Sequence, residues 1–85
     1  MNWTRPLIIE ELKSILVSAD ERKRDILDSV TEDSTLTEDL GLSSIGILYI
    51  VIAVEETFKI RFDNISAGDF ATLREVVDYI EKKLK

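Results

Sequence analysis

Apolar residues recur at helical spacing near the start of the chain. From about Arg5 to Ala19 this spacing predicts a first helix, with a buried stripe of Ile8, Leu12, Ile15 (or Leu16) and Ala19. Pro6 suits the opening turn of such a helix, because the N–H group that proline lacks would have no helical partner there. We therefore expect an amphipathic helix in this part of the chain.

The stretch that follows is mostly polar. Residues 20–30 either extend the first helix or form another short one through Ile26, Leu27 and Val30. Residues 31–35 are predicted to be a loop, because their Thr, Ser and Asp side chains readily bond to the nearby backbone. The sequence therefore predicts a long first connection.

An almost unbroken apolar run from Ile45 to Val54 predicts a second helix, which starts at Ser43 or Ser44 and ends near Phe58. Either serine can cap the first turn. The run is rich in β-branched residues, so a strand is the competing interpretation. A strand of that length would be unusual in a small domain, and we therefore predict a helix.

This second helix carries more apolar residues than one face can bury. A surface helix of a small bundle needs a single apolar stripe, which is expected to be Ile47, Ile50, Val51, Val54 and Phe58. The other large apolar side chains then point outward beside Ser44: Ile45, Leu48, Tyr49 and Ile52. Exposed apolar patches commonly mark partner surfaces. The alternative is that the first helix or the long loop covers Leu48 and Tyr49.

The rest of the chain predicts one short and one long helix. Residues 58–62 alternate between apolar and polar, which allows a short extended segment, and residues 63–70 are typical of a turn plus a single helical turn. Thr72 and Glu75 have capping-box spacing, so a last helix is expected to start there and to bury Leu73, Val76, Val77, Ile80 and Leu84. The predicted fold is all-α: a small four-helix bundle, three main helices and one short one, in a single domain over residues 1–85.

Composition narrows the function classes. The chain has 11 basic and 17 acidic residues, a net charge of −6, whereas a nucleic-acid partner requires a basic surface. It has no cysteine and no histidine, which excludes disulfides, the usual zinc sites and Ser–His or Cys–His catalytic pairs. The longest uncharged stretch, Leu40 to Val54, has fifteen residues, fewer than the roughly 20 apolar residues of a membrane span. Since no signal peptide is evident either, we expect a cytoplasmic protein.

The negative charge is concentrated ahead of Ser44. From Ala19 to Ser43 there are eight acidic residues against three basic ones, a net charge of −5. A solvated loop is the simple interpretation, and a patch for a basic partner is the functional one. We expect no metal site, because Glu38 and Ser44 replace the glycine and glutamate that a calcium loop requires around this position.

The segment around Ser44 carries the candidate chemistry. Asp39, Leu40 and Gly41, followed by two serines and Ile45, resemble the attachment motif of acyl carrier proteins, commonly Asp-Leu-Gly-x-Asp-Ser-Leu. The serine of that motif carries a 4′-phosphopantetheine arm. It falls on Ser44 here, which lies five residues after Asp39 and immediately before an apolar residue.

The resemblance extends beyond the motif. Roughly residues 31–84 align without a forced gap, including Thr35–Leu36, Ala53–Phe58, Ile60, Phe62 and Val76–Ile80. The chain departs from fatty-acid carriers at Ser43, where many have aspartate, and at Gly46 and Tyr49, where acidic residues are frequent. Its apolar second helix looks more like that of a specialised carrier in a polyketide, nonribosomal peptide or other dedicated acyl pathway.

The resemblance implies a freestanding carrier protein, not an enzyme. A phosphopantetheinyl transferase, using coenzyme A and Mg²⁺, would place the arm on Ser44, and the arm's thiol would then present thioesters to acyl-loading and acyl-processing enzymes. The residues favour the same chemistry, since a helix N-terminus attracts a phosphodiester and Gly41 permits a tight turn before it. With no histidine as base, Ser44 is a poor hydrolytic nucleophile.

We expect a monomer that docks its partners through the acidic section and a patch around Ser44, comprising Asp39, Leu42, Ser43, Ile45, Leu48, Tyr49 and Ile52. The alternative is an unmodified helical interaction module, whose patch binds one partner or a second copy of the chain. A small hydrolase is less favoured, because no nucleophile with an acid–base pair is evident.

Overall fold

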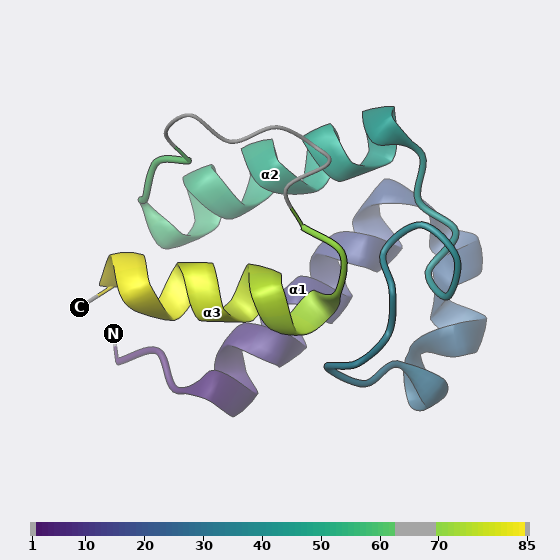
Figure 1. Ribbon diagram of the computed structural model, residues 1–85, viewed down its shortest axis with the longest axis horizontal. Coiled ribbons are helices and arrows are strands. Elements are labelled where there is room, and N and C mark those ends of the chain that lie inside the picture. Colours follow the sequence, from purple (N-terminus) through teal and green to yellow (C-terminus); the bar gives the residue numbers. More distant parts are fainter. Residues whose placement is uncertain (1, 63–69, 85) are drawn as a thin grey trace.

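The computed structural model describes residues 2–62 and 70–84. In these ranges the helices are α1 (Arg5–Ala19), the 3₁₀ helix η1 (Glu21–Ser29), α2 (Ser44–Phe58) and α3 (Leu73–Leu84) (Figure 1). Helix α1 packs against the other three elements. The all-α fold is confirmed, and residues 20–30 form a separate short helix rather than an extension of the first. The helical turn predicted within residues 63–70 lies, except for Phe70, outside the described residues.

Helix α1 begins and ends where its sequence predicts. Thr4 is the N-cap, and its hydroxyl accepts a hydrogen bond from the N–H of Leu7 at 3.4 Å. Both alternatives for the third core position, Ile15 and Leu16, are buried. Ala19, expected in the buried stripe, is exposed, so that part of the prediction is wrong. The reason is that α1 stops at Ala19 and the extended backbone at Asp20 turns the chain into η1.

Helix α2 is a helix and not a strand. Its core face is as predicted, with Ile47, Ile50, Val54 and Phe58 buried and Val51 half-buried. The helix ends at Phe58, and its C-cap residue, Lys59, adopts the left-handed conformation at φ 59°. The chain then turns back, and Ile60 is buried in the core. The N–H of Phe62 donates a hydrogen bond to a carboxylate oxygen of Glu55 at 2.8 Å, which holds this segment against α2. Residues 60–62 therefore alternate in burial as expected but form no strand.

Helix α3 is capped by its own acidic residue. The Glu75 carboxylate accepts hydrogen bonds from the N–H groups of Thr72 at 3.0 Å and Ala71 at 2.7 Å, the side-chain half of the predicted capping box. Its inward residues are buried as predicted, namely Leu73, Val76, Val77 and Ile80, while Leu84 is half-buried. Lys82 and Lys83 lie in the last turn, where positive charge stabilises a helix.

Backbone hydrogen bonds hold the loop before α2 against the start of α3. Leu36 N–H donates to the carbonyl of Ala71 at 3.0 Å, Leu73 N–H to Ser34 at 3.0 Å, and Arg74 N–H to Glu32 at 2.8 Å. Further along the loop, Leu36, Leu40 and Leu42 are buried in the core. The segment that leads into α2 is therefore fixed at both ends.

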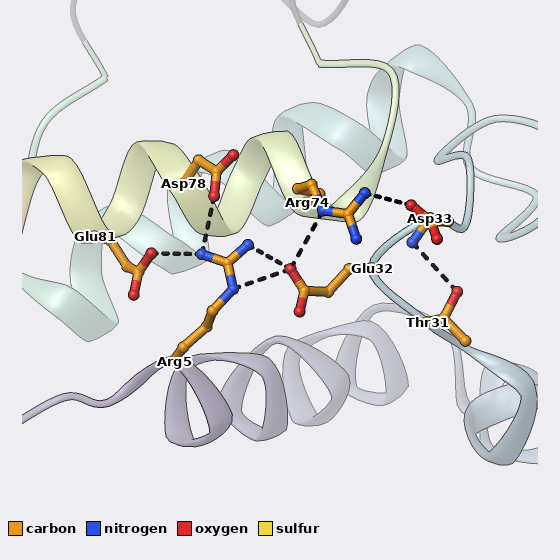
Figure 2. A network of polar contacts seen from close by, with 7 residues as sticks. All are labelled: Arg5, Thr31, Glu32, Asp33, Arg74, Asp78 and Glu81. Carbon is orange, nitrogen blue, oxygen red and sulfur yellow. Dashed lines mark hydrogen bonds and ion pairs between the residues drawn. The ribbon is translucent and has the colours of Figure 1, made fainter.

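An ionic network of side chains also joins this loop to α1 and α3. Figure 2 shows Arg5 of α1 between Glu32 of the loop and two carboxylates of α3. Its guanidinium donates to Glu32 at 3.0 Å, lies 2.9 Å from Asp78 and also bonds Glu81. The hydrogen bond from Arg5 lowers the pKa of the Glu32 carboxyl, and the same bond raises the pKa of Arg5. This network, with Arg74 and Asp33 at its edge, joins α1, the loop and α3.

Candidate functional site

The two adjacent serines differ in what their hydroxyl groups do. Ser43 is the N-cap of α2, and its Oγ accepts a hydrogen bond from the N–H of Gly46 at 3.2 Å. Ser44 is the first helical residue; its side chain is exposed and bonds to none of the residues that the structure describes. The capping role, open to either serine on sequence grounds, thus belongs to Ser43, and the Ser44 hydroxyl faces solvent without a structural task.

The turn ahead of these serines is shaped by Gly41 and Asp39. Gly41 has φ +65°, a conformation that side chains with a Cβ disfavour. Asp39 and Thr35 bond reciprocally, since the Asp39 carboxylate accepts from Thr35 N–H at 2.9 Å and the Thr35 hydroxyl from Asp39 N–H at 3.0 Å. The exposed Asp39 therefore supports the loop, whatever else it does.

The N-terminus of α2 fits a phosphodiester on Ser44. The N–H groups of Ser44 and Ile45 have no acceptor in the described parts of the chain, while Ile47 N–H bonds to the Ser43 carbonyl at 2.9 Å. These N–H groups and the positive end of the helix dipole favour an anion at this point. Because α2 has no acidic residue in its first turn, nothing there opposes that charge.

The outward face of α2 is apolar, as the sequence predicts. The exposed fractions are 80% for Ile45, 48% for Leu48, 46% for Tyr49 and 57% for Ile52, so neither α1 nor the loop covers them. We call these four residues the α2 patch. Leu42 was expected to join it, but it is 8% exposed and belongs to the core, because the turn at Gly41 directs it inward. That part of the expected patch is wrong.

Seven of the eight acidic residues between Ala19 and Ser43 fall into two sets, and the eighth, Asp39, bonds to Thr35. Glu32, Asp33 and Asp20 are held by basic side chains, so part of the negative charge is structural. The other set is exposed and forms no ion pair within residues 2–62 and 70–84: Glu21, Asp25, Asp28 and Glu38. This second set leaves negative charge exposed at the surface.

The interior offers little space for a bound molecule. A void of about 20 Å³ lies among apolar side chains of α1, α2, α3 and the loop, including Leu12, Leu40, Ile50 and Val54. That volume is close to the space one water molecule needs. No group of residues in the described parts of the chain is arranged to hold a metal ion, and no helix there is long and apolar enough to cross a membrane.

One residue of the site was not singled out from the sequence. Lys23 of η1 lies beside the turn, since a Cβ atom added to Gly41 would meet its Nζ at 3.2 Å. No local signal identifies this neighbour, because the two residues are far apart in the chain and come together only through the fold. Chemically, the site joins an exposed hydroxyl, open N–H groups, an apolar surface and one nearby cation.

Comparison with known proteins agrees with this geometry. Residues 10–80 match a family described as the phosphopantetheine attachment site. The chain is 32% identical to the acyl carrier protein of Thermotoga maritima over 95% of this chain and 96% of that protein. It is 35% identical to that of Wolinella succinogenes over 87% and 93%, and 33% identical to that of Onion yellows phytoplasma over 89% and 96%, respectively.

Proposed function

The chain belongs to the acyl carrier protein family, and from this premise we propose that Ser44 bears its 4′-phosphopantetheine. Members of this family are carriers rather than catalysts, and they hold the arm covalently. The observation that carries the assignment is the difference between the two serines: Ser43 caps α2, whereas the Ser44 hydroxyl is exposed and has no partner among the described residues. Only Ser44 can be esterified without removing the cap.

The arm supplies a thiol, and acyl groups travel on it as thioesters. Ser44 itself is a substrate rather than a nucleophile of an active site, because the chain has no histidine to act as its base. The exposed N–H groups of the first turn of α2 accommodate the phosphodiester. Gly41 has no side chain and therefore leaves room for the transferase to approach the hydroxyl. Residues 1–85 act in this proposal as one carrier domain.

The α2 patch is the docking surface for the phosphopantetheinyl transferase and for the acyl-loading and acyl-processing enzymes. Ile45 directly follows Ser44 and is 80% exposed, so an enzyme that reaches the serine contacts this residue. Apolar contact then fixes the complex, while the exposed acidic set, which comprises Glu21, Asp25 and Asp28 of η1 and Glu38 of the loop, guides the encounter. Leu42 is left out of this surface because it is buried.

An apolar docking helix favours a dedicated pathway. Residues 44–54 of α2 carry no charge, whereas an enzyme of the general fatty-acid pathway is expected to bind an acidic second helix. We therefore propose a specialised carrier of the polyketide, nonribosomal peptide or similar type. A cytoplasmic location and a monomeric state stay predictions.

Intact mass spectrometry tests the attachment. The purified chain is incubated with coenzyme A, Mg²⁺ and a broad-specificity phosphopantetheinyl transferase, alongside Ser44→Ala and the matched control Ser43→Ala. We expect one phosphopantetheine on the parent and on Ser43→Ala, and none on Ser44→Ala, with each variant folded by circular dichroism.

Two other outcomes are informative. Modification that persists in Ser44→Ala and is lost in Ser43→Ala would assign the arm to Ser43. A parent chain that never gains mass would instead favour an unmodified interaction module, in which the α2 patch binds a single partner or a second copy.

A further inference from the structure

A lysine is packed beside the turn that leads to Ser44. Only 18% of the Lys23 side chain is exposed, so its aliphatic stem is largely covered and its ammonium group is held in place. That ammonium lies next to Gly41, where no side chain intervenes. The fold thus places the ammonium group of Lys23 beside Gly41, which is three residues before Ser44 in the chain.

Lys23 also lines an open groove at the N-terminus of α2. The groove has a volume of about 330 Å³ and passes between η1 and α2. Ser43 and Ile45, the two neighbours of Ser44, form part of its wall, and Tyr49 lies one turn further along. Ligand sites for small molecules begin at about 300 Å³, so the groove is large enough for part of a pantetheine arm.

The ammonium group of Lys23 forms only a long ion pair with Asp20, the N-cap residue of η1, which also lines the groove. Its Nζ is 3.9 Å from the Asp20 carboxylate, at the limit of an ion pair. Asp20 instead accepts hydrogen bonds from Arg22, at 3.0 Å from the backbone N–H and at 3.0 and 2.9 Å from the guanidinium. The bonds from Arg22, with a smaller Coulombic contribution from Lys23, lower the pKa of Asp20 to about 2. By its three hydrogen bonds, Arg22 is the main partner of Asp20.

We infer that Lys23 binds the phosphodiester of the arm and directs the arm into this groove between η1 and α2. The inference rests on the proposed attachment at Ser44, which brings the phosphate to the edge of the groove. An ammonium group and a phosphodiester attract each other most where water is partly excluded, and the covered stem of Lys23 provides such a place.

Several other described cations lie away from this groove. Arg5 and Arg74 belong to the network with Glu32. Lys13 and Arg24 line a different groove, together with Glu10 and Asp28. Lys13 is a matched control for Lys23, because its side chain is 25% exposed and its only ion pair, with Glu10, is 3.7 Å long in the described part of the chain.

The test compares apo and holo forms of the parent, Lys23→Met, Lys23→Arg and Lys13→Met. Each holo form is first verified by intact mass, so a failure of the Ser44 assignment is seen before this question is asked. Methionine keeps the apolar stem, and the apo variants report any effect on the fold itself. The readouts are the ³¹P resonance of the phosphodiester and the change in melting temperature when the arm is added.

In the parent we expect the arm to raise the melting temperature by about 2–4 °C more than in Lys23→Met, the size of a partly screened ion pair in a domain of this length. The ³¹P resonance should move in Lys23→Met, stay close to the parent in Lys23→Arg, and be unchanged in Lys13→Met. Equal ³¹P shifts and equal effects of the arm in both methionine variants would overturn the inference, since any contribution of Lys23 would then be independent of the arm.

Discussion

Two regions of this small carrier treat their side chains in opposite ways. Around Arg5, three carboxylates and a second arginine from α1, the loop and α3 are joined in one network (Figure 2). On the α2 patch, four large apolar side chains are exposed and residues 44–54 carry no charge. The first region pairs its charged groups within the chain, whereas the second leaves its apolar side chains exposed.

The comparison suggests different roles for the two regions: the Arg5 network stabilises the fold, and the α2 patch serves the proposed function. The ion pairs of the Arg5 network join segments that are far apart in the chain, since Arg5 is 27 residues from Glu32 and 76 from Glu81. The proposed attachment site lies at the start of α2, where residues 44–54 carry no charge and so form no ion pairs. A substitution in one region should therefore affect stability, and a substitution in the other should affect transfer.

The largest effect on stability is expected for Arg5→Met. The change leaves Glu32, Asp78 and Glu81 close together without their shared cation, and we expect a loss of about 1–2 kcal/mol in the free energy of unfolding. In a domain of this size the melting temperature should fall by about 5–10 °C. Thermal unfolding measures this. The rate at which Ser44 is modified, measured well below the transition, should stay within twofold.

A smaller effect, of the opposite kind, is expected for Tyr49→Glu. A charge on the α2 patch interrupts its apolar surface, so the rate of arm transfer by the transferase should fall by about threefold to tenfold, roughly 1 kcal/mol in the transition state. Tyr49→Phe is the control and should keep the parent rate. Stability should change by less than about 0.5 kcal/mol, because the residue is half exposed.

The separation of the two regions fails if Tyr49→Glu destabilises the fold as much as Arg5→Met does. It fails equally if the charge on the patch leaves transfer unchanged with the transferase and with every partner enzyme.

The smallest effect concerns pH. The lowered pKa of Glu32 means that its ionised form is favoured in the folded chain, so its contribution to stability is complete above the ordinary glutamate pKa of about 4.3 and is lost as pH falls through the lower, folded value. In urea unfolding at pH 7 and pH 3, the parent should lose more stability on acidification than Glu32→Gln. Equal losses would show that the network does not depend on this carboxylate.

Much of the fold follows from local sequence signals. The bounds of α1, α2 and α3 agree with the helical periodicity, the capping residues and Pro6. The exposed α2 patch was also predictable, because a small bundle cannot bury a helix that is apolar on every side. These features depend on residues within a few positions of one another.

The errors and omissions are of another kind. Leu42 was placed on the surface and Ala19 in the core, because periodicity does not show where the chain turns at Gly41 and Asp20. The Arg5 network and the position of Lys23 beside Gly41 depend on tertiary packing, which no spacing in the sequence reveals. Assigning the cap to Ser43 rather than Ser44 likewise needed coordinates.

The hydrogen bonds between the loop and the start of α3 also bear on how the protein is made. Leu36 and Ser34 reach their partners Ala71 and Leu73 only after that helix has been synthesised, whereas Ser44 leaves the ribosome some thirty residues earlier. A nascent chain therefore exposes the serine before the loop leading to it has acquired these bonds. An enzyme that recognises the bonded loop would therefore act only after the start of α3 has been synthesised.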